Sequence, residues 1–201
     1  MSNRQNHFNQ IINKLEAHYG ASKPPTITDP FHLLLYENIA YLADDTKRDA
    51  AFAALKKEVG LKPTDILSAS TERLVGITKL GGIHAELRAA RLKEVAHIVL
   101  NEFQGDLESV LRLPLPKAIK ALRQFPSIGE PGAEKVLLFT GTYPVLALES
   151  NGLRVLLRAL FGEERKDYAA SYRSVQKALQ DQIGTDCKFS NSGPPVAAST
   201  R

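Results

Sequence analysis

Apolar residues recur at helical spacing along most of the chain. Close to the N-terminus, Phe8, Ile11, Leu15 and Tyr19 lie three or four positions apart, which predicts a helix that Gly20 ends. Similar patterns predict about ten helices, counting short ones, and no stretch alternates apolar and polar residues as a half-buried strand does. We therefore predict an all-α protein.

The helix after the first linker begins with a capping signal. Asp29 stands directly before Pro30, and this order is typical of a helix start because proline tolerates the first turn. Apolar residues then continue to Leu42. The pattern predicts one helix through Leu42, with Leu42 on its apolar stripe.

A glycine pair precedes the longest predicted helix. Gly81 and Gly82 predict a sharp turn, and the helical pattern that follows spans residues 83–103. Arg88 and Arg91 lie three positions apart in this helix and therefore share a face. We interpret that face as either solvated or directed toward phosphates.

A short turn between two further helical patterns predicts a helical hairpin. Residues 116–124 are helical in pattern, residues 125–129 (FPSIG) form the turn, and a second helix begins at about Pro131. We expect Gly129 to supply the unusual backbone angles of the turn. The unpaired N–H groups of such a turn and helix start can bind a phosphate. An ordinary antiparallel helix pair is the alternative.

A lone carboxylate follows the hairpin. Residues 141–148 read as a break and a short extended segment, and Glu149 comes next, just before another helix. We predict that this helix begins at Gly152 and that Ser150 and Asn151 cap it.

Together these residues resemble the helix-hairpin-helix DNA glycosylases, the superfamily of endonuclease III and the adenine glycosylase of mismatch repair. In that family a Leu-Pro-Gly-Val-Gly hairpin is followed by a helix, an apolar segment and a catalytic Asp. The likeness extends more weakly from about residue 29 to about residue 182. The matching positions here are Phe125, Pro126, Ile128, Gly129, Ala133, Val136, Leu137, Tyr143, Pro144, residues 148–151, Arg154 and Val155.

The resemblance implies a two-lobed helical protein of the endonuclease III type. Residues 29–140 would form a helical barrel domain that contains the hairpin. Residues 1–28 and 141–201 would form the second lobe, with 184–201 disordered because that stretch is polar and rich in small residues. The active cleft would lie between the lobes, with Glu149 at its edge.

The sequence departs from the family pattern at three positions of the site. Pro131 stands where bifunctional members carry the lysine that attacks the sugar, which argues against lyase activity. The adenine glycosylase type also lacks this lysine and carries an Asn matched by Asn151. Glu149 replaces the family Asp, and its side chain is longer by one bond, ~1.5 Å. Ser127 replaces the first hairpin glycine.

The family's iron–sulfur cluster is not expected. Such a cluster needs four thiolates, and the sequence contains one cysteine, Cys187. The five histidines show no metal-ligand spacing, so no catalytic metal is expected either. Carbonyl groups of a hairpin of this kind can hold a monovalent cation, although such a site has no signature in the side chains.

The resemblance implies one catalytic residue, Glu149, as the carboxylate that stabilises positive charge on the sugar. A Glu before a helix is also a common partner of the helix N-terminus, and for Asn151 and Leu42 a helix cap and a core position are the alternatives. Glu37 lies one position from the acid that adenine glycosylases carry. The residues expected to contact DNA are Ser127, Ile128, Gly129, Gly132, Lys135, Asn151 and, as a wedge into the gap left by a flipped base, Leu42.

Composition narrows the class of protein but not its function. The 201 residues are 43% hydrophobic and 24% charged, as in a soluble globular protein, and suffice for one domain or two small lobes. The net charge of +4 permits nucleic-acid binding without requiring it. We expect a monomer that binds double-stranded DNA, no membrane association, and a cytoplasmic location (nucleoid-associated in a bacterium).

Three functional hypotheses follow. The first is a DNA repair N-glycosylase that removes damaged or mismatched bases, of the monofunctional type because Pro131 has no amine. The second is a DNA-binding relative that keeps the hairpin and has lost the chemistry. The third is a helical protein that no longer binds DNA.

Overall fold

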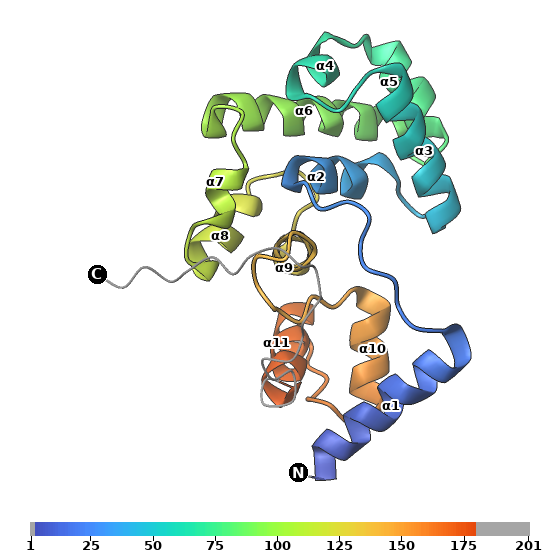
Figure 1. Cartoon of the computed structure of the whole chain (residues 1–201), viewed down its shortest axis with the longest axis vertical. Helices are drawn as coiled ribbons and strands as arrows, with labels where there is room; N and C mark the ends of the chain where they lie inside the picture. The colour runs from blue at the N-terminus through green and yellow to red at the C-terminus, as the bar shows by residue number, and fades with distance from the viewer. Residues whose placement is uncertain (1–2, 180–201) are drawn as a thin grey trace. The chain divides into compact units, whose positions relative to one another are not determined.

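The computed structural model describes residues 3–179, and this part of the chain is all-α, as predicted. The predicted disordered segment 184–201 and Cys187 lie outside the described residues. No helix in residues 3–179 combines the length and the apolar character needed to cross a membrane. The helices are α1 (Asn3–Tyr19), α2 (Pro30–Ile39), α3 (Asp45–Glu58), α4 (Pro63–Ser68), α5 (Thr71–Lys79), α6 (Ala85–Phe103), α7 (Glu108–Leu111), α8 (Leu115–Leu122), α9 (Glu130–Phe139), α10 (Ser150–Arg158) and α11 (Tyr168–Leu179) (Figure 1).

The chain folds into two compact units. The larger unit is Ile27–Ala147 and contains α2 to α9. The smaller unit combines Met1–Thr26 with Leu148–Arg201, and its described helices are α1, α10 and α11. Each unit is described below by itself.

Polar side chains fix the starts of several helices. The Asp29 carboxylate accepts a hydrogen bond from the backbone N–H of His32 at 2.8 Å, and Asp44 does the same for Lys47 at 2.9 Å. These caps satisfy N–H groups that have no partner within the helix. The cap predicted at Asp29 is therefore confirmed.

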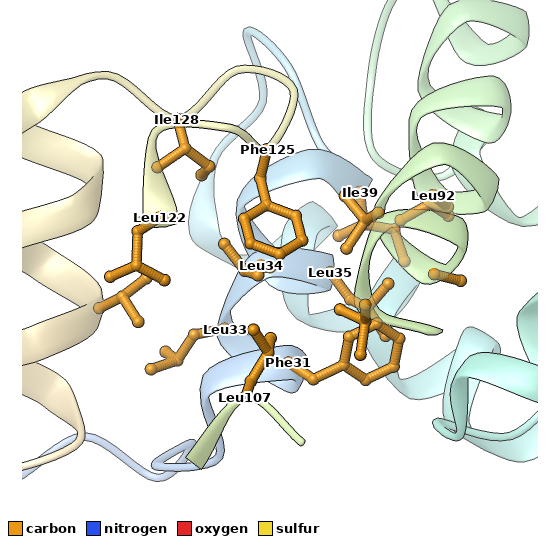
Figure 2. Close-up of a cluster of buried hydrophobic side chains, with 14 of the residues drawn as sticks. Phe31, Leu33, Leu34, Leu35, Ile39, Leu92, Leu107, Leu122, Phe125 and Ile128 are labelled. Carbon is orange, nitrogen blue, oxygen red and sulfur yellow. The ribbon is translucent and has the colours of Figure 1, made fainter. Parts of the chain in front are cut away.

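Helix α2 is the centre of the larger unit and packs against α3, α6 and α9. Leu34, Leu35 and Ile39 are completely buried on it, and Figure 2 shows Leu34 next to Phe125 of the hairpin turn and Ile39 next to Leu92 of α6. Burying a side chain of this size contributes about 1.5–3 kcal/mol. The hairpin is thus attached to the core through its own apolar residues.

The prediction that α2 continues to Leu42 was wrong. The helix ends at Ile39, and Ala40 adopts an extended backbone. The next N–H, of Tyr41, donates to the carbonyl oxygen of Gly81 at 3.0 Å, so pairing with a distant loop replaces the next helical turn. Leu42 is 78% exposed and has a left-handed backbone (φ 49°), and it is therefore not a core residue.

The smaller unit has a separate apolar centre. Leu153 and Leu156 of α10 are buried, as are Tyr172, Val175 and Leu179 of α11. Helices α10 and α11 pack against each other. Helix α1 joins them through Phe8, whose ring meets the buried ring of Phe161 edge-on with centroids 5.8 Å apart.

Candidate nucleic-acid interface

The hairpin turn is closed by a hydrogen bond from the N–H of Ile128 to the carbonyl oxygen of Phe125, at 3.2 Å. Pro126 and Ser127 are the two central residues, and Ser127 is left-handed (φ 64°). Proline followed by a residue with positive φ is the arrangement of a type II turn, in which the second position favours glycine. The expectation for Gly129 was wrong. Its backbone is extended (φ −84°, ψ −172°), because the chain reverses at Pro126 and Ser127, before it reaches Gly129.

The turn presents N–H groups to solvent, as a phosphate site requires. Gly129 caps α9, and both it and Ser127 are exposed. Within residues 3–179, no acceptor is found for the N–H groups of Ser127, Gly129, Glu130 and Gly132. Glu130 also places a carboxylate in the first turn of α9. That charge suits the helix dipole and would compete with a bound phosphate.

A buried amide ties the hairpin to α2. Asn38 is 2% exposed, and its Nδ2 donates to the carbonyl oxygens of Leu34 at 3.0 Å and of Pro126 at 3.1 Å. Its Oδ1 has no partner among the described residues. An unpaired buried polar atom costs stability, and the two hydrogen bonds made by Nδ2 offset this cost.

An ion pair joins α2 to α9, the second helix of the hairpin. The Nζ atom of Lys135 on α9 lies 2.7 Å from Oε1 of Glu37 on α2. The Lys135 ammonium group also lies over the ring of Phe139, 5.7 Å from its centroid. Glu37 therefore offsets part of the charge that Lys135 would offer to DNA.

Arg88 joins the loop after α2 to the loop before α6. This side chain is 1% exposed, so it lies on neither a solvated nor a phosphate-facing surface, contrary to prediction. Its Nε donates to the carbonyl oxygen of Ile83 at 2.8 Å and its Nη2 to that of Gly82 at 2.6 Å. Its Nη1 donates to the carbonyl oxygen of Ile39. Burial lowers the pKa of Arg88.

The close approach of the same two loops requires glycine at positions 81 and 82. A Cβ atom on Gly81 would lie 2.4 Å from the carbonyl oxygen of Ile39, and one on Gly82 would lie 2.4 Å from that of Tyr41. The two backbones thus approach more closely than side chains allow. The paired loops carry a group of apolar side chains that are at least about half exposed: Tyr41, Leu42, Leu80, Ile83 and, at the start of α6, Leu87.

Glu149, in the smaller unit, is the N-cap of α10. Its Oε1 accepts a hydrogen bond from the N–H of Gly152 at 2.7 Å. The cap predicted for Ser150 and Asn151 was wrong, because the helix begins at Ser150, two residues earlier than expected. Asn151 instead accepts a hydrogen bond through Oδ1 from Nη2 of Arg154 at 2.5 Å.

The carboxylate of Glu149 is open to solvent. Its side chain is exposed, and Oε1 alone is used by the cap, so Oε2 has no hydrogen-bond partner within residues 3–179. Burial, and secondly the charge of Glu149, raise the pKa of the nearby Tyr168. The carboxylate thus has one structural partner and one free oxygen.

The sequence contained signals for two residues that its interpretation missed. Asn38 interrupts the apolar stripe of α2, and a polar residue in such a place commonly holds neighbouring backbone. Arg88 lies on the buried face of α6, in register with Ala85, Leu92 and Val95. A charged residue on a buried face indicates local hydrogen-bond partners.

The larger unit thus brings together the predicted hairpin residues Ser127, Ile128, Gly129, Gly132 and Lys135. Ile128 is buried and contributes to the core, while its neighbours on the turn are exposed. Leu42 belongs to the same unit, and Glu149 and Asn151 belong to the other. All of their proposed contacts with DNA remain predictions.

The fold is that of the endonuclease III type of DNA glycosylase, as the sequence resemblance implied. The chain is similar to endonuclease III in a trapped covalent DNA intermediate, with 17% identity, 88% of this chain and 77% of the other covered, and a TM-score of 0.67. It is also similar to the H. pylori 3-methyladenine DNA glycosylase MagIII bound to 1,N6-ethenoadenine (18% identity, 89% and 83% covered, TM-score 0.68). A third similar structure is a thermostable thymine-DNA glycosylase (17% identity, 94% and 92% covered, TM-score 0.59). No protein-family model matches the sequence, and no curated protein matches it.

Proposed function

We propose that the protein is a DNA repair glycosylase that hydrolyses the N-glycosidic bond of a damaged or mismatched base. One observation carries this proposal: the same unit contains two exposed features. They are a hairpin turn with free N–H groups and a loop in which Leu42 is exposed and left-handed. The hairpin supplies a phosphate anchor and Leu42 a wedge, which are two of the parts that base flipping needs. The fold shared with solved glycosylases supports the same proposal.

In this proposal Glu149 stabilises the developing positive charge on the sugar and positions the attacking water. Its free Oε2 is the oxygen available for that task, since Oε1 caps α10. Hydrolysis without lyase activity follows from Pro131, which offers no amine to the sugar. The DNA contacts would be made by the N–H groups of Ser127, Gly129 and Gly132 and by the partly neutralised Lys135.

We propose double-stranded DNA as the partner, a monomeric protein, and a cytoplasmic site of action. Asn151 would contribute through its pairing with Arg154 near the sugar–phosphate chain. No iron–sulfur cluster enters the reaction, because this sequence has a single cysteine.

A DNA-binding protein without catalysis is the second candidate. The observation that favours it is the hydrogen bond from Gly152 to Glu149, since it gives the carboxylate a structural task. In that case the hairpin would still bind duplex DNA, and no lesion would be cut.

The two candidates are separated by a lesion panel. Duplexes with a single uracil, thymine glycol, or 8-oxoguanine opposite adenine are incubated with the wild type and with Glu149→Gln. The glutamine keeps an oxygen for the cap and removes the charge, so we expect base release by the wild type alone and equal melting temperatures. Equal release by both proteins would remove Glu149 from the mechanism. Duplex binding without any release would establish the second candidate.

Salt dependence tests the phosphate anchor separately. Binding that neutralises phosphates weakens as salt concentration rises, with a slope set by the number of contacts. Duplex affinity that does not change between low and physiological salt would contradict both candidates.

A further inference from the structure

A pocket of about 400 Å³ in the larger unit shares only Ser127 with the DNA contacts proposed above. It lies beside the hairpin turn and the paired loops, and all of its lining residues belong to Ile27–Ala147. Its volume falls in the range of roughly 300–1,000 Å³ that is common for small-ligand sites, and it is too large for a phosphate alone. The pocket is lined by Tyr41, His84, Leu87, Arg88, Arg91 and Ser127.

The lining favours an anion. Among the groups that line it are the guanidinium group of Arg91 and the imidazole ring of His84, and the lining contains no carboxylate. The hydrogen bonds of Arg88 are directed to three loop carbonyl groups. Arg91, in contrast, is half-buried and has no hydrogen-bond or ion-pair partner within residues 3–179. A partly desolvated cation without a counter-ion gains from a bound anion.

The same pocket offers flat rings. The Tyr41 and His84 rings lie 6.0 Å apart between centroids, with 36° between their planes, and both side chains are exposed. Leu87 adds an apolar edge. Aromatic faces next to basic groups are the usual means by which proteins hold unstacked bases.

We propose that this pocket binds one unstacked nucleotide of a DNA strand, with its base on Tyr41 and its phosphate at Arg91 and His84. The inference rests on the proposed DNA binding. Tyr41 directly precedes the exposed Leu42, so a base that Leu42 displaces finds an aromatic surface one residue away. Arg88 fixes the carbonyl groups of both loops and so keeps the pocket wall in place.

The test compares two duplexes of the same sequence, one fully paired and one with a single bulged adenine. Fluorescence anisotropy measures the affinity of the wild type, Tyr41→Ala and Arg91→Ala for both. We expect the wild type to prefer the bulged duplex and each variant to reduce that preference about tenfold. Neither side chain makes a hydrogen bond within the described residues, so both variants should melt with the wild type.

Two matched variants serve as controls. Tyr41→Phe keeps the ring and should keep the preference. Lys56→Ala removes one exposed positive charge of the same unit that does not line the pocket, and it should also keep the preference. Free deoxyadenosine monophosphate is added as competitor to distinguish a strand from a free nucleotide.

Loss of preference in the two alanine variants alone supports the inference. An unchanged preference in both variants, or a wild type that binds both duplexes equally, overturns the inference and leaves the proposed DNA binding standing. Competition by the free nucleotide at the concentration of the strand assigns the pocket to a free nucleotide and also overturns it. Failure to bind either duplex removes the proposed function itself.

Discussion

The position of the left-handed residue in the hairpin turn leads to a paired test of backbone strain. Ser127 adopts φ 64°, whereas Gly129 adopts φ −84°. A left-handed conformation costs a residue with a Cβ atom about 1–2 kcal/mol, while glycine pays nothing there. Glycine also loses more backbone freedom on folding, which costs roughly 0.5–1 kcal/mol. The difference predicts that Ser127→Gly raises the free energy of unfolding by about 0.5–1 kcal/mol.

Gly129→Ala should leave the free energy of unfolding nearly unchanged, because a gain and a loss offset each other. An added Cβ atom would have one neighbour, the Cδ atom of Pro131 at 3.8 Å, so the extended backbone accepts alanine without a clash. The variant has a less flexible unfolded chain, which is worth about 0.4–1 kcal/mol. Gly129 is also the N-cap of α9, where alanine is less favourable than glycine by a similar amount. If Gly129 carried the unusual angles, alanine would instead destabilise the turn.

Urea denaturation of the single and double variants measures both effects. The gain expected for Ser127→Gly corresponds to a rise in melting temperature of roughly 1–4 °C for a chain of this length. Ser127→Ala is the control: it keeps a Cβ atom and should stay within about 0.5 kcal/mol of the wild type. A destabilised Ser127→Gly together with a destabilised Gly129→Ala would refute the reasoning and assign the strained position to Gly129.

Three further predictions concern the two loops and the hairpin. Arg88→Met leaves three carbonyl groups of the paired loops without their donor; we expect a loss of about 3 kcal/mol or more in urea denaturation, and a loss below 1 kcal/mol would show that the clamp contributes little. Gly81→Ala should cost about 1–3 kcal/mol by the same assay, because its Cβ atom would overlap the carbonyl oxygen of Ile39, and unchanged stability would mean that the loops separate easily. Glu130→Gln removes a carboxylate from the first turn of α9; we expect the affinity for duplex DNA at low salt to rise about 2- to 5-fold, corresponding to roughly 0.3–1 kcal/mol. An unchanged affinity for Glu130→Gln would mean that no phosphate approaches these amides.

The sequence was sufficient to predict the fold because local signals and the long-range structure agree in most helices. The caps at Asp29 and Asp44 act locally, and apolar stripes at helical spacing face the core. The hairpin was predictable for the same reason, since its turn and its helices are contiguous in the chain.

The errors arose where distant segments meet. The end of α2 depends on the hydrogen bond from Tyr41 to Gly81, which joins residues 40 positions apart and leaves no trace in local periodicity. The burial of Arg88 depends on acceptors supplied by the same two loops. The left-handed position was wrongly assigned to Gly129 because the hairpin has a serine at position 127, where glycine was expected, and Gly129 is the next glycine in the chain. The catalytic role of Glu149 and the DNA contacts are questions of chemistry, and they await the assays above.

If the protein flips bases as proposed, the loop that carries Leu42 would determine which partner must deform. The loop backbone is held by Arg88, by Gly81 and by its pairing with the neighbouring loop, so it has little freedom to adapt to an intact helix. The work of parting two stacked base pairs then falls on the DNA, whose resistance depends on its sequence and integrity. A mispaired or lesioned step opens at lower cost than a sound one. A rigid probe of this kind would sample many sites and dwell at weak ones, so that part of the selectivity for damage precedes any recognition of the base.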